Sequence, residues 1–411
     1  MEMLNLSDKI SVPSRSSMSL NRVNGDLTLG RGAIVNGTEP GAKVEVNGRV
    51  HCEGDNKFQC SLKAEQFNAE GDVTIHGDLE ISGTVEVEDG RLEVYGKMIA
   101  DTVNIDEALH VSKDLQATEV DVGGAIKVDE NAKIKKVDVG GSLKVRGELE
   151  SENIDVGGSV SAESKVDVEV LHVGGSATVA GGKIQEIDVG GSFESRDSLE
   201  FERIDVGGTV RLSGKSKGGK IEVGGLLKVD GDLVFEEIDV GGTVEITGSG
   251  EGEEVDVGGK VEIGGALKLS GDLDVGGKVK VEDQLSADNI DIGGVLHAKK
   301  AVAENRVDVG GSITTSEGVH ARFAEIGKHG KVHGPIRAER VIIGKDADVE
   351  DVYGKDVVLR SGTYAENVYG ENITVESHCH IRGEVQYTDE LRMNENVTLA
   401  KKPQKVDTLP T

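Results

Sequence analysis

The feature that most constrains this 411-residue sequence is a Gly-Gly pair that returns every 16–18 residues through its middle. An Asp-Val dipeptide precedes most of the pairs. The pairs begin at Gly123, Gly140, Gly157, Gly174, Gly190, Gly207, Gly224, Gly241, Gly258, Gly276, Gly293 and Gly310. Spacing this regular indicates one structural unit stacked on copies of itself.

The repeating unit is too short for helices and has the pattern of strands. A helix pair needs about 33 residues, twice the period found here. Apolar and polar residues alternate in Leu143-Lys144-Val145, in Ile154-Asp155-Val156 and in Val160-Ser161-Ala162. Period-two alternation is typical of a strand with one buried face. Each unit holds about three such runs, so we expect an all-β, single-stranded parallel β-helix of about 22 coils with about 17 residues each.

The Gly pair is expected at a corner of the coil, where glycine reaches positive φ without a Cβ clash. Two interpretations of the Asp before it remain open. We favour an Asx-turn in which the Asp accepts a hydrogen bond from the first Gly amide; the alternative is a column of carboxylates that binds Ca²⁺ or another cation. We take as the corner motif Asp138, Gly140, Gly141, Asp155, Gly157, Gly158, Asp205, Gly207 and Gly208.

Composition argues against nucleic-acid binding and indicates where the protein is located. Asp and Glu total 75 against 46 Lys and Arg, a net charge of −29, so binding to a nucleic-acid backbone is not expected. Three cysteines, Cys52, Cys60 and Cys379, suit a reducing compartment. No run has the length of a signal peptide, and we expect a cytoplasmic protein. The segment Met1–Leu6 is expected to be a disordered tail, with weak membrane contact as the alternative.

The spacing divides the chain into five parts. They are a disordered N-terminal tail (1–22), irregular coils (23–117), the regular array (118–317), weaker C-terminal coils (318–400) and a disordered basic tail (401–411).

No stretch of the sequence carries a catalytic signature. His378 and His380 fall on one face of a strand with Cys379 on the other, but the spacing fixes no third metal ligand. Left-handed acyltransferase helices repeat every six residues, and pectin-cleaving helices carry long loops with clustered charges; neither pattern is present. We therefore expect no enzyme activity, no metal and no cofactor.

The C-terminal rhythm resembles a known family. Its residues are Gly334-Pro335-Ile336-Arg337 and Val341-Ile342-Ile343-Gly344, then Asp351-Val352-Tyr353-Gly354 and Asn367-Val368-Tyr369-Gly370. This cadence resembles the bactofilins, the polymer-forming cytoskeletal proteins. The resemblance implies a right-handed, three-sided parallel β-helix that assembles end to end into nonpolar filaments without nucleotide. It also implies tails that contact membrane or protein partners. The sequence departs from the family in its length and in the array at its centre.

The predicted function is a structural scaffold that self-assembles into filaments. The candidate end-to-end interface is the apolar set of the last strands: Tyr387, Leu391, Met393, Val397 and Leu399. The alternatives are a non-polymerising acidic rod that binds basic partner proteins, and a carbohydrate-active or acyltransferring β-helix.

Overall fold

Aliphatic residues on three short strands form the interior of each coil. In the coil that contains Gly140 and Gly141, the inward residues are Val137 and Val139, then Leu143 and Val145, then Leu149, each at most 2% exposed. We name the three sides of the coil from this example. Face A contains residues 136–139, face B residues 142–145, and face C residues 149–151.

The structure is a computed structural model that describes residues 9–39 and 41–410, in two compact units, Met1–Val206 and Gly207–Thr411. Both units are solenoids of parallel strands, with about 23 turns in all, about 17 residues per turn and no helix among the described residues. The predicted all-β parallel β-helix is therefore confirmed.

In the first unit, face A is formed by β1 (Lys9–Val12), β4 (Asp26–Leu29), β7 (Arg49–Cys52), β10 (Gln66–Glu70), β13 (Thr84–Glu88), β16 (Thr102–Ile105) and β29 (Arg203–Val206). Face B is formed by β2 (Ser17–Leu20), β5 (Ile34–Gly37), β8 (Asn56–Phe58), β11 (Val73–Ile75), β14 (Arg91–Val94), β17 (Ala108–Val111), β19 (Ala125–Val128), β21 (Ser142–Val145), β23 (Ser159–Ala162), β25 (Ser176–Val179) and β27 (Ser192–Ser195). Face C is formed by β3 (Arg22–Val23), β6 (Lys43–Val46), β9 (Ser61–Ala64), β12 (Leu79–Ile81), β15 (Met98–Ile99) and β28 (Leu199–Glu200). Longer strands run from face C into face A: β18 (Leu115–Val122), β20 (Ala132–Val139), β22 (Leu149–Val156), β24 (Val166–Val173) and β26 (Gly182–Val189).

In the second unit, face A is formed by β32 (Lys220–Val223), β35 (Glu237–Val240), β38 (Glu254–Val257) and β41 (Asp272–Val275). Face B is formed by β30 (Thr209–Ser213), β33 (Leu226–Asp230), β36 (Thr243–Ile246), β39 (Lys260–Ile263), β44 (Ser312–Thr315), β46 (Lys331–His333), β50 (His380–Ile381) and β52 (Thr398–Leu399). Face C is formed by β31 (Ser216–Lys217), β34 (Leu233–Val234), β37 (Gly250–Gly252), β40 (Leu267–Leu269) and β53 (Gln404–Lys405). Longer strands that span two or three faces are β42 (Lys278–Ile292), β43 (Val295–Val309), β45 (Val319–Ile326), β47 (Ile336–Ile343), β48 (Asp348–Leu359), β49 (Tyr364–Val375) and β51 (Val385–Met393).

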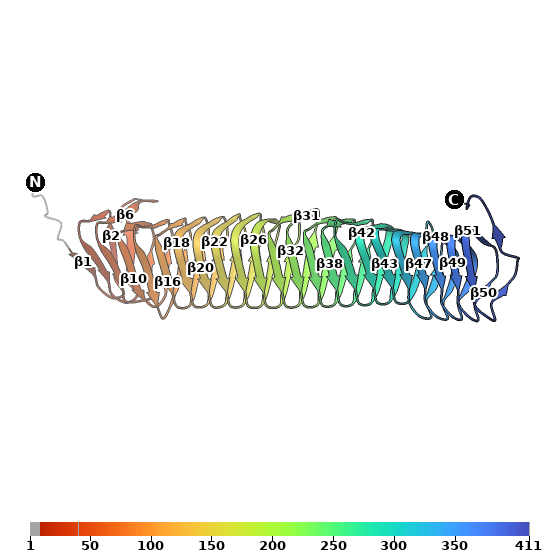
Figure 1. The fold of residues 1–411 in the computed structure, drawn as a ribbon. Helices are drawn as coiled ribbons and strands as arrows, with labels where there is room; N and C mark the ends of the chain where they lie inside the picture. The colour runs from red at the N-terminus through yellow and green to blue at the C-terminus, as the bar shows by residue number, and fades with distance from the viewer. Residues whose placement is uncertain (1–8, 40, 411) are drawn as a thin grey trace, which may run out of the picture. The chain divides into compact units, whose positions relative to one another are not determined.

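Register between coils keeps like residues in columns. Val122, Val139 and Val156 are direct partners across β18, β20 and β22, as are Asp121, Asp138 and Asp155 on the outside. Figure 1 shows these strands stacked side by side in the first unit. Buried columns of identical Val residues and exposed columns of identical Asp residues are therefore consequences of one repeat length.

The Gly pair lies at the corner between faces A and B, as predicted, but the predicted reason was wrong. None of the pair's glycines in the array has positive φ among the described residues. The corner is instead too closely stacked for a side chain, because a Cβ on Gly157 would lie 2.5 Å from the carbonyl oxygen of Gly140. In the second unit, a Cβ on Gly225 would lie 2.6 Å from the carbonyl oxygen of Gly208.

The same corner has a different form near each terminus of the chain. There it is four residues long, and its third residue is left-handed: φ is 56° at Arg15, 55° at Asp346 and 61° at His378. The fourth residue is buried at Ala347 and Thr363, both 0% exposed, and half-buried at Ser16. The Gly-Gly corner and the four-residue corner are thus two backbone conformations that turn the chain from face A into face B.

The described parts of two predicted tails contain strands that belong to coils. Residues 9–22 were expected to be disordered, but β1 pairs with β4, and β2 with β5. Val12 is 0% and Leu20 9% exposed, and Ser17 and Ser19 are the outward residues of the alternating strand β2. At the other terminus, β53 within the expected tail 401–411 pairs with β51. The segment Met1–Leu6, expected to be a disordered tail with weak membrane contact as the alternative, and residue Thr411 lie outside the described residues.

Candidate assembly interface at the C-terminal coil

The last coil of the second unit, residues 388–410, is stacked on one side only. Its face A strand is the end of β51, which pairs with β49; β52 pairs with β50, and β53 with the start of β51. No further strand pairs with the opposite edge of this coil within the described part of the chain. Backbone donors and acceptors at that edge are therefore open to a partner strand.

The apolar residues of this coil continue buried columns but are not covered themselves. Leu391 is the partner of Ile373, Met393 of Val375, and Leu399 of Ile381. The earlier residues are 1%, 0% and 2% exposed. Met393 is 44% exposed, and Leu391 and Leu399 are half-buried.

Val397 completes this set at the corner between faces A and B. It directly precedes β52, as the fully buried Cys379 directly precedes β50, and β50 and β52 are paired strands. Val397 is half-buried. We call Leu391, Met393, Val397 and Leu399 the terminal apolar ring.

The fifth predicted residue, Tyr387, lies outside this ring. It stands opposite Gly370 in β49, and Lys405 of β53 pairs with it on the other side. Tyr387 is half-buried, and it belongs to the coil that the terminal one covers. The sequence alone could not separate it from the others, because it gave no sign that residues 404–405 return to the sheet.

Two ion pairs lie on the surface of the terminal coil. Lys401 Nζ lies 3.0 Å from Glu384 Oε1, and Arg392 lies 2.7 Å from Glu390 within the same strand. The hydrogen bond from Arg392 lowers the pKa of Glu390, and the one from Lys401 lowers the pKa of Glu384. These groups are exposed, so each pair adds little to stability.

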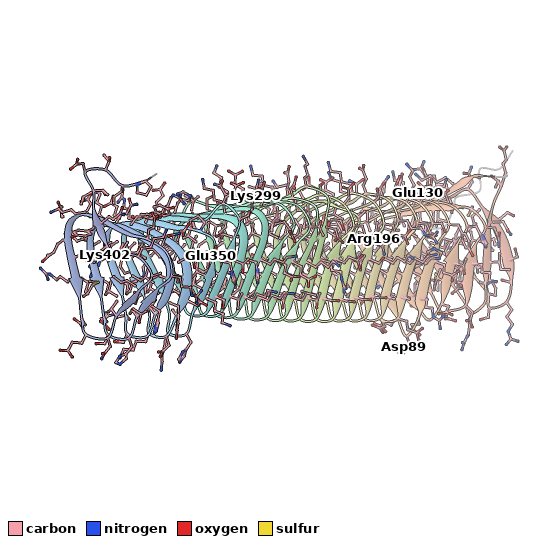
Figure 2. The ribbon with its side chains drawn as sticks, turned by 90° about the vertical axis from the view of Figure 1, so that its right-hand side faces the viewer. Asp89, Glu130, Arg196, Lys299, Glu350 and Lys402 are labelled. Carbon is pink, nitrogen blue, oxygen red and sulfur yellow. The ribbon has the colours of Figure 1, made fainter. Side chains whose placement is uncertain are left out.

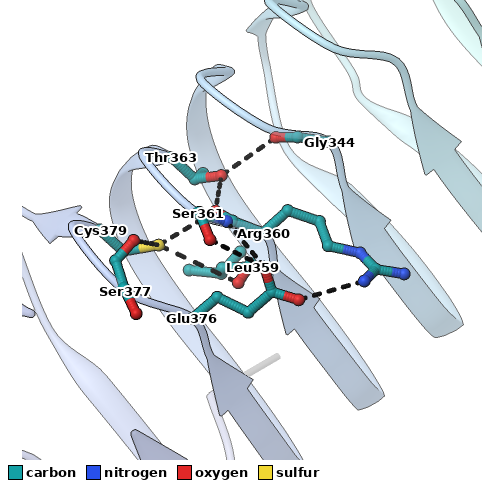
Figure 3. Close-up of polar contacts among 8 residues, drawn as sticks. All are labelled: Gly344, Leu359, Arg360, Ser361, Thr363, Glu376, Ser377 and Cys379. Atoms are coloured by element: carbon teal, nitrogen blue, oxygen red, sulfur yellow. Dashed lines mark hydrogen bonds and ion pairs between the residues drawn. The ribbon is translucent and has the colours of Figure 1, made fainter. Parts of the chain in front are cut away.

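The corner beneath the terminal coil is rigidly hydrogen-bonded (Figure 3). Glu376 Oε2 accepts hydrogen bonds of 3.0 Å from both the backbone amide and the hydroxyl of Ser361, while its other oxygen lies 3.1 Å from Arg360. Thr363 Oγ1 lies 2.6 Å from the Arg360 carbonyl oxygen and 3.1 Å from that of Gly344. Partial burial opposes ionisation of Glu376, but the bonds from Ser361 and Arg360 outweigh it and lower the pKa. These bonds tie the corner that begins at Glu376 to the two corners that precede it in the stack.

The Asp residues of the corner motif make no Asx-turn, and that prediction was wrong. The amide of Gly140 donates to the Val122 carbonyl at 3.1 Å, and the amide of Gly157 to Val139 at 2.9 Å, so the coil-to-coil ladder already uses both donors. Asp138 and Asp155 stand exposed on face A. Asp205 lies 3.5 Å from Arg203 in the same strand.

The cation interpretation of this column has no geometric support. Across the described residues, no group of three or more His, Cys, Asp or Glu side chains is arranged to hold a metal ion. His378 and His380 do not converge on a shared site either, since His380 Nδ1 lies 3.1 Å from the backbone oxygen of His378.

Comparison with known proteins adds no assignment: no family model, no curated protein and no solved structure matches this chain. No helix in the described part of the chain is long and apolar enough to cross a membrane.

Proposed function

We propose that this chain is a bactofilin-like structural scaffold, without catalytic activity, whose copies assemble end to end through the C-terminal coil. The observation that supports the proposal most directly is the terminal apolar ring. Its residues occupy columns that are buried everywhere below them, and Met393 is 44% exposed. A second copy that stacked on this edge would extend both the apolar columns and the backbone ladder.

The strength of such a contact is modest. Full burial of an aliphatic side chain contributes about 1.5–3 kcal/mol, and three of the four ring residues are already half-buried. Association itself costs at least about 4 kcal/mol of lost freedom. Assembly should therefore depend strongly on protein concentration and, because each copy carries a charge of −29, on salt.

The test is electron microscopy and light scattering over a concentration series, with matched variants. Leu391→Asp combined with Val397→Asp places two charges in the ring and should abolish assembly. Asn394→Asp combined with Thr398→Asp adds the same charge to exposed positions of the same coil and should leave assembly intact. Filaments that persist unchanged in the first variant would exclude this interface.

A second candidate function is a non-polymerising acidic solenoid that binds partner proteins. Strands β52 and β53 have two residues each, and β51 carries a register irregularity between Tyr387 and Glu390. Short, bulged and charged edge strands are a known means of preventing edge-to-edge pairing. Single particles at every concentration, with wild-type fold, would favour this candidate over self-assembly.

A further inference from the structure

A groove of about 510 Å³ lies on the first unit, where face C runs into face A. It follows the stacking direction across coils that contribute residues from Ile99 to Glu169. Five coils stacked ~4.8 Å apart give it a length of ~19 Å, which matches about six residues of extended chain. In each coil the strand bends where face C meets face A. The outward residues on both sides of this bend form the walls of the groove, and the small residues at the bend form its floor.

One end of the groove is apolar. Ile99 is 42% exposed, among the most exposed large apolar side chains of the described residues. The floor beside it is formed by Ala100 and Ala117, each 7% exposed, and by Ile134. An exposed isoleucine next to small apolar floor residues offers a site for one or two aliphatic side chains of a ligand.

The other end is acidic. In the middle, Lys133 pairs with Glu150 at 2.5 Å and Lys135 with Glu152 at 3.5 Å, so these charges cancel. Beyond them come Asp167 and Glu169, for which no ion pair occurs in the portion of the chain that the structure describes. The groove lining therefore ends in two carboxylates at one end only, with Lys183, the cross-strand partner of Asp167, just beyond the lining.

We propose that this groove binds an extended peptide segment of a partner protein, with aliphatic side chains at the Ile99 end and Lys or Arg at the Asp167–Glu169 end. A peptide fits better than a glycan, because no aromatic residue lines the groove to stack on a sugar ring. The strongly negative charge of the whole chain favours the approach of a basic partner. This surface lies in the first unit, so the proposal stands independently of assembly through the C-terminal coil.

The test uses a fluorescein-labelled peptide, Val-Thr-Val-Thr-Lys-Thr-Lys, and the full-length protein, with binding followed by fluorescence anisotropy. Two further peptides carry Ser for each Val, or Glu for each Lys. We expect saturable binding of the first peptide only. Asp167→Lys combined with Glu169→Lys should weaken it about tenfold or more, since it reverses the charge that the lysines meet. Ile99→Ser should weaken it while leaving the charge unchanged.

A matched control separates this site from general attraction to an acidic protein. Glu130→Lys combined with Glu148→Lys makes the same change of charge at exposed positions outside the groove and should leave the affinity within about twofold. Figure 2 shows Glu130 on the outer surface of the first unit. Equal losses in the groove and control variants, equal binding of the Ser-substituted peptide, or no saturable binding would each overturn the proposal. Circular dichroism of every variant verifies that the fold is retained.

Discussion

At the scale of single residues, the Gly pair is defined by what surrounds it and not by its own backbone angles. The carbonyl oxygen of each pair lies where the next coil's Cβ would be, at 2.5 Å for Gly157 over Gly140. The repeat therefore keeps glycine to allow close stacking. Steric exclusion of this kind cannot be read from one coil, because it exists only between two.

Gly157→Ala should accordingly destabilise the first unit. The added methyl group must displace backbone, and overpacking of this kind costs about 1–3 kcal/mol. Ser159→Ala, two positions later on an exposed site, adds no atoms and should change stability by less than about 0.5 kcal/mol. Urea unfolding followed by circular dichroism measures both. Equal midpoints for the two variants would contradict the stacking argument.

Two aspartates should respond to pH in opposite directions. Partial burial and the neighbouring Asp308 and Asp274 raise the pKa of Asp291, so its charged form is disfavoured in the folded state and destabilises it as pH rises above the acid range. The pKa of Asp129 is lowered, mainly by a hydrogen bond from His110, so its charged form stabilises the fold and that contribution is lost as pH falls.

Asp291→Asn should therefore raise stability at neutral pH, by about 0.2–1 kcal/mol as for like charges paired across strands, and should have less effect near pH 4. Asp129→Asn should lower stability at neutral pH, and again less so near pH 4. Melting temperatures of the three proteins at the two pH values measure the difference. If either substitution changed the melting temperature equally at both pH values, the pKa shift assigned to that aspartate would be wrong.

At the scale of elements, the strands were predictable and the corners were only partly so. Alternation in Leu143-Lys144-Val145 specifies which side chains face inward, and the period specifies the coil. Several four-residue corners escaped prediction because their left-handed residue is not glycine, as at Arg15, Asp346 and His378, although Gly362 holds that position in the corner before Thr363. The groove escaped it too, since its concavity depends on how the backbone bends between two strand runs.

The four-residue corners should depend on their buried polar residue. Thr363 is 0% exposed, and its hydroxyl is bound to the carbonyl oxygens of Arg360 and Gly344 (Figure 3). Thr363→Val keeps the shape but removes the hydroxyl from the Gly344 carbonyl oxygen, while the Arg360 carbonyl oxygen still accepts from the Thr363 backbone amide at 3.2 Å. The change should destabilise the second unit by about 1–3 kcal/mol. Thr374→Val, on the outward side of β49, is the matched control and should be nearly neutral. Chemical denaturation of the two variants compares them; equal stabilities would show that the hydroxyl has no role in the corner.

At the scale of the whole molecule, stability depends on position along each stack. A coil in the interior of a unit has neighbours on both sides, whereas residues 388–410 have one. Nearest-neighbour stacks lose their terminal repeats first. The coil that is proposed to join copies is therefore expected to open more readily than the interior coils, and binding of a second copy should suppress that opening.

The reactivity of the three cysteines measures how readily the terminal coil opens compared with the interior coils, and it does so in the unmodified protein. Burial raises the pKa of all three thiols, that of Cys60 to about 11, so none should react quickly in the folded protein. Cys52 and Cys60 lie within the first unit, while Cys379 is covered only by the terminal coil and should be labelled fastest by a thiol reagent in native buffer. If copies join through that coil, labelling of Cys379 should slow as protein concentration rises, and labelling of Cys52 should not. Peptide mass spectrometry resolves the three rates. A Cys379 rate independent of concentration, under conditions where light scattering detects assembly, would place the junction elsewhere.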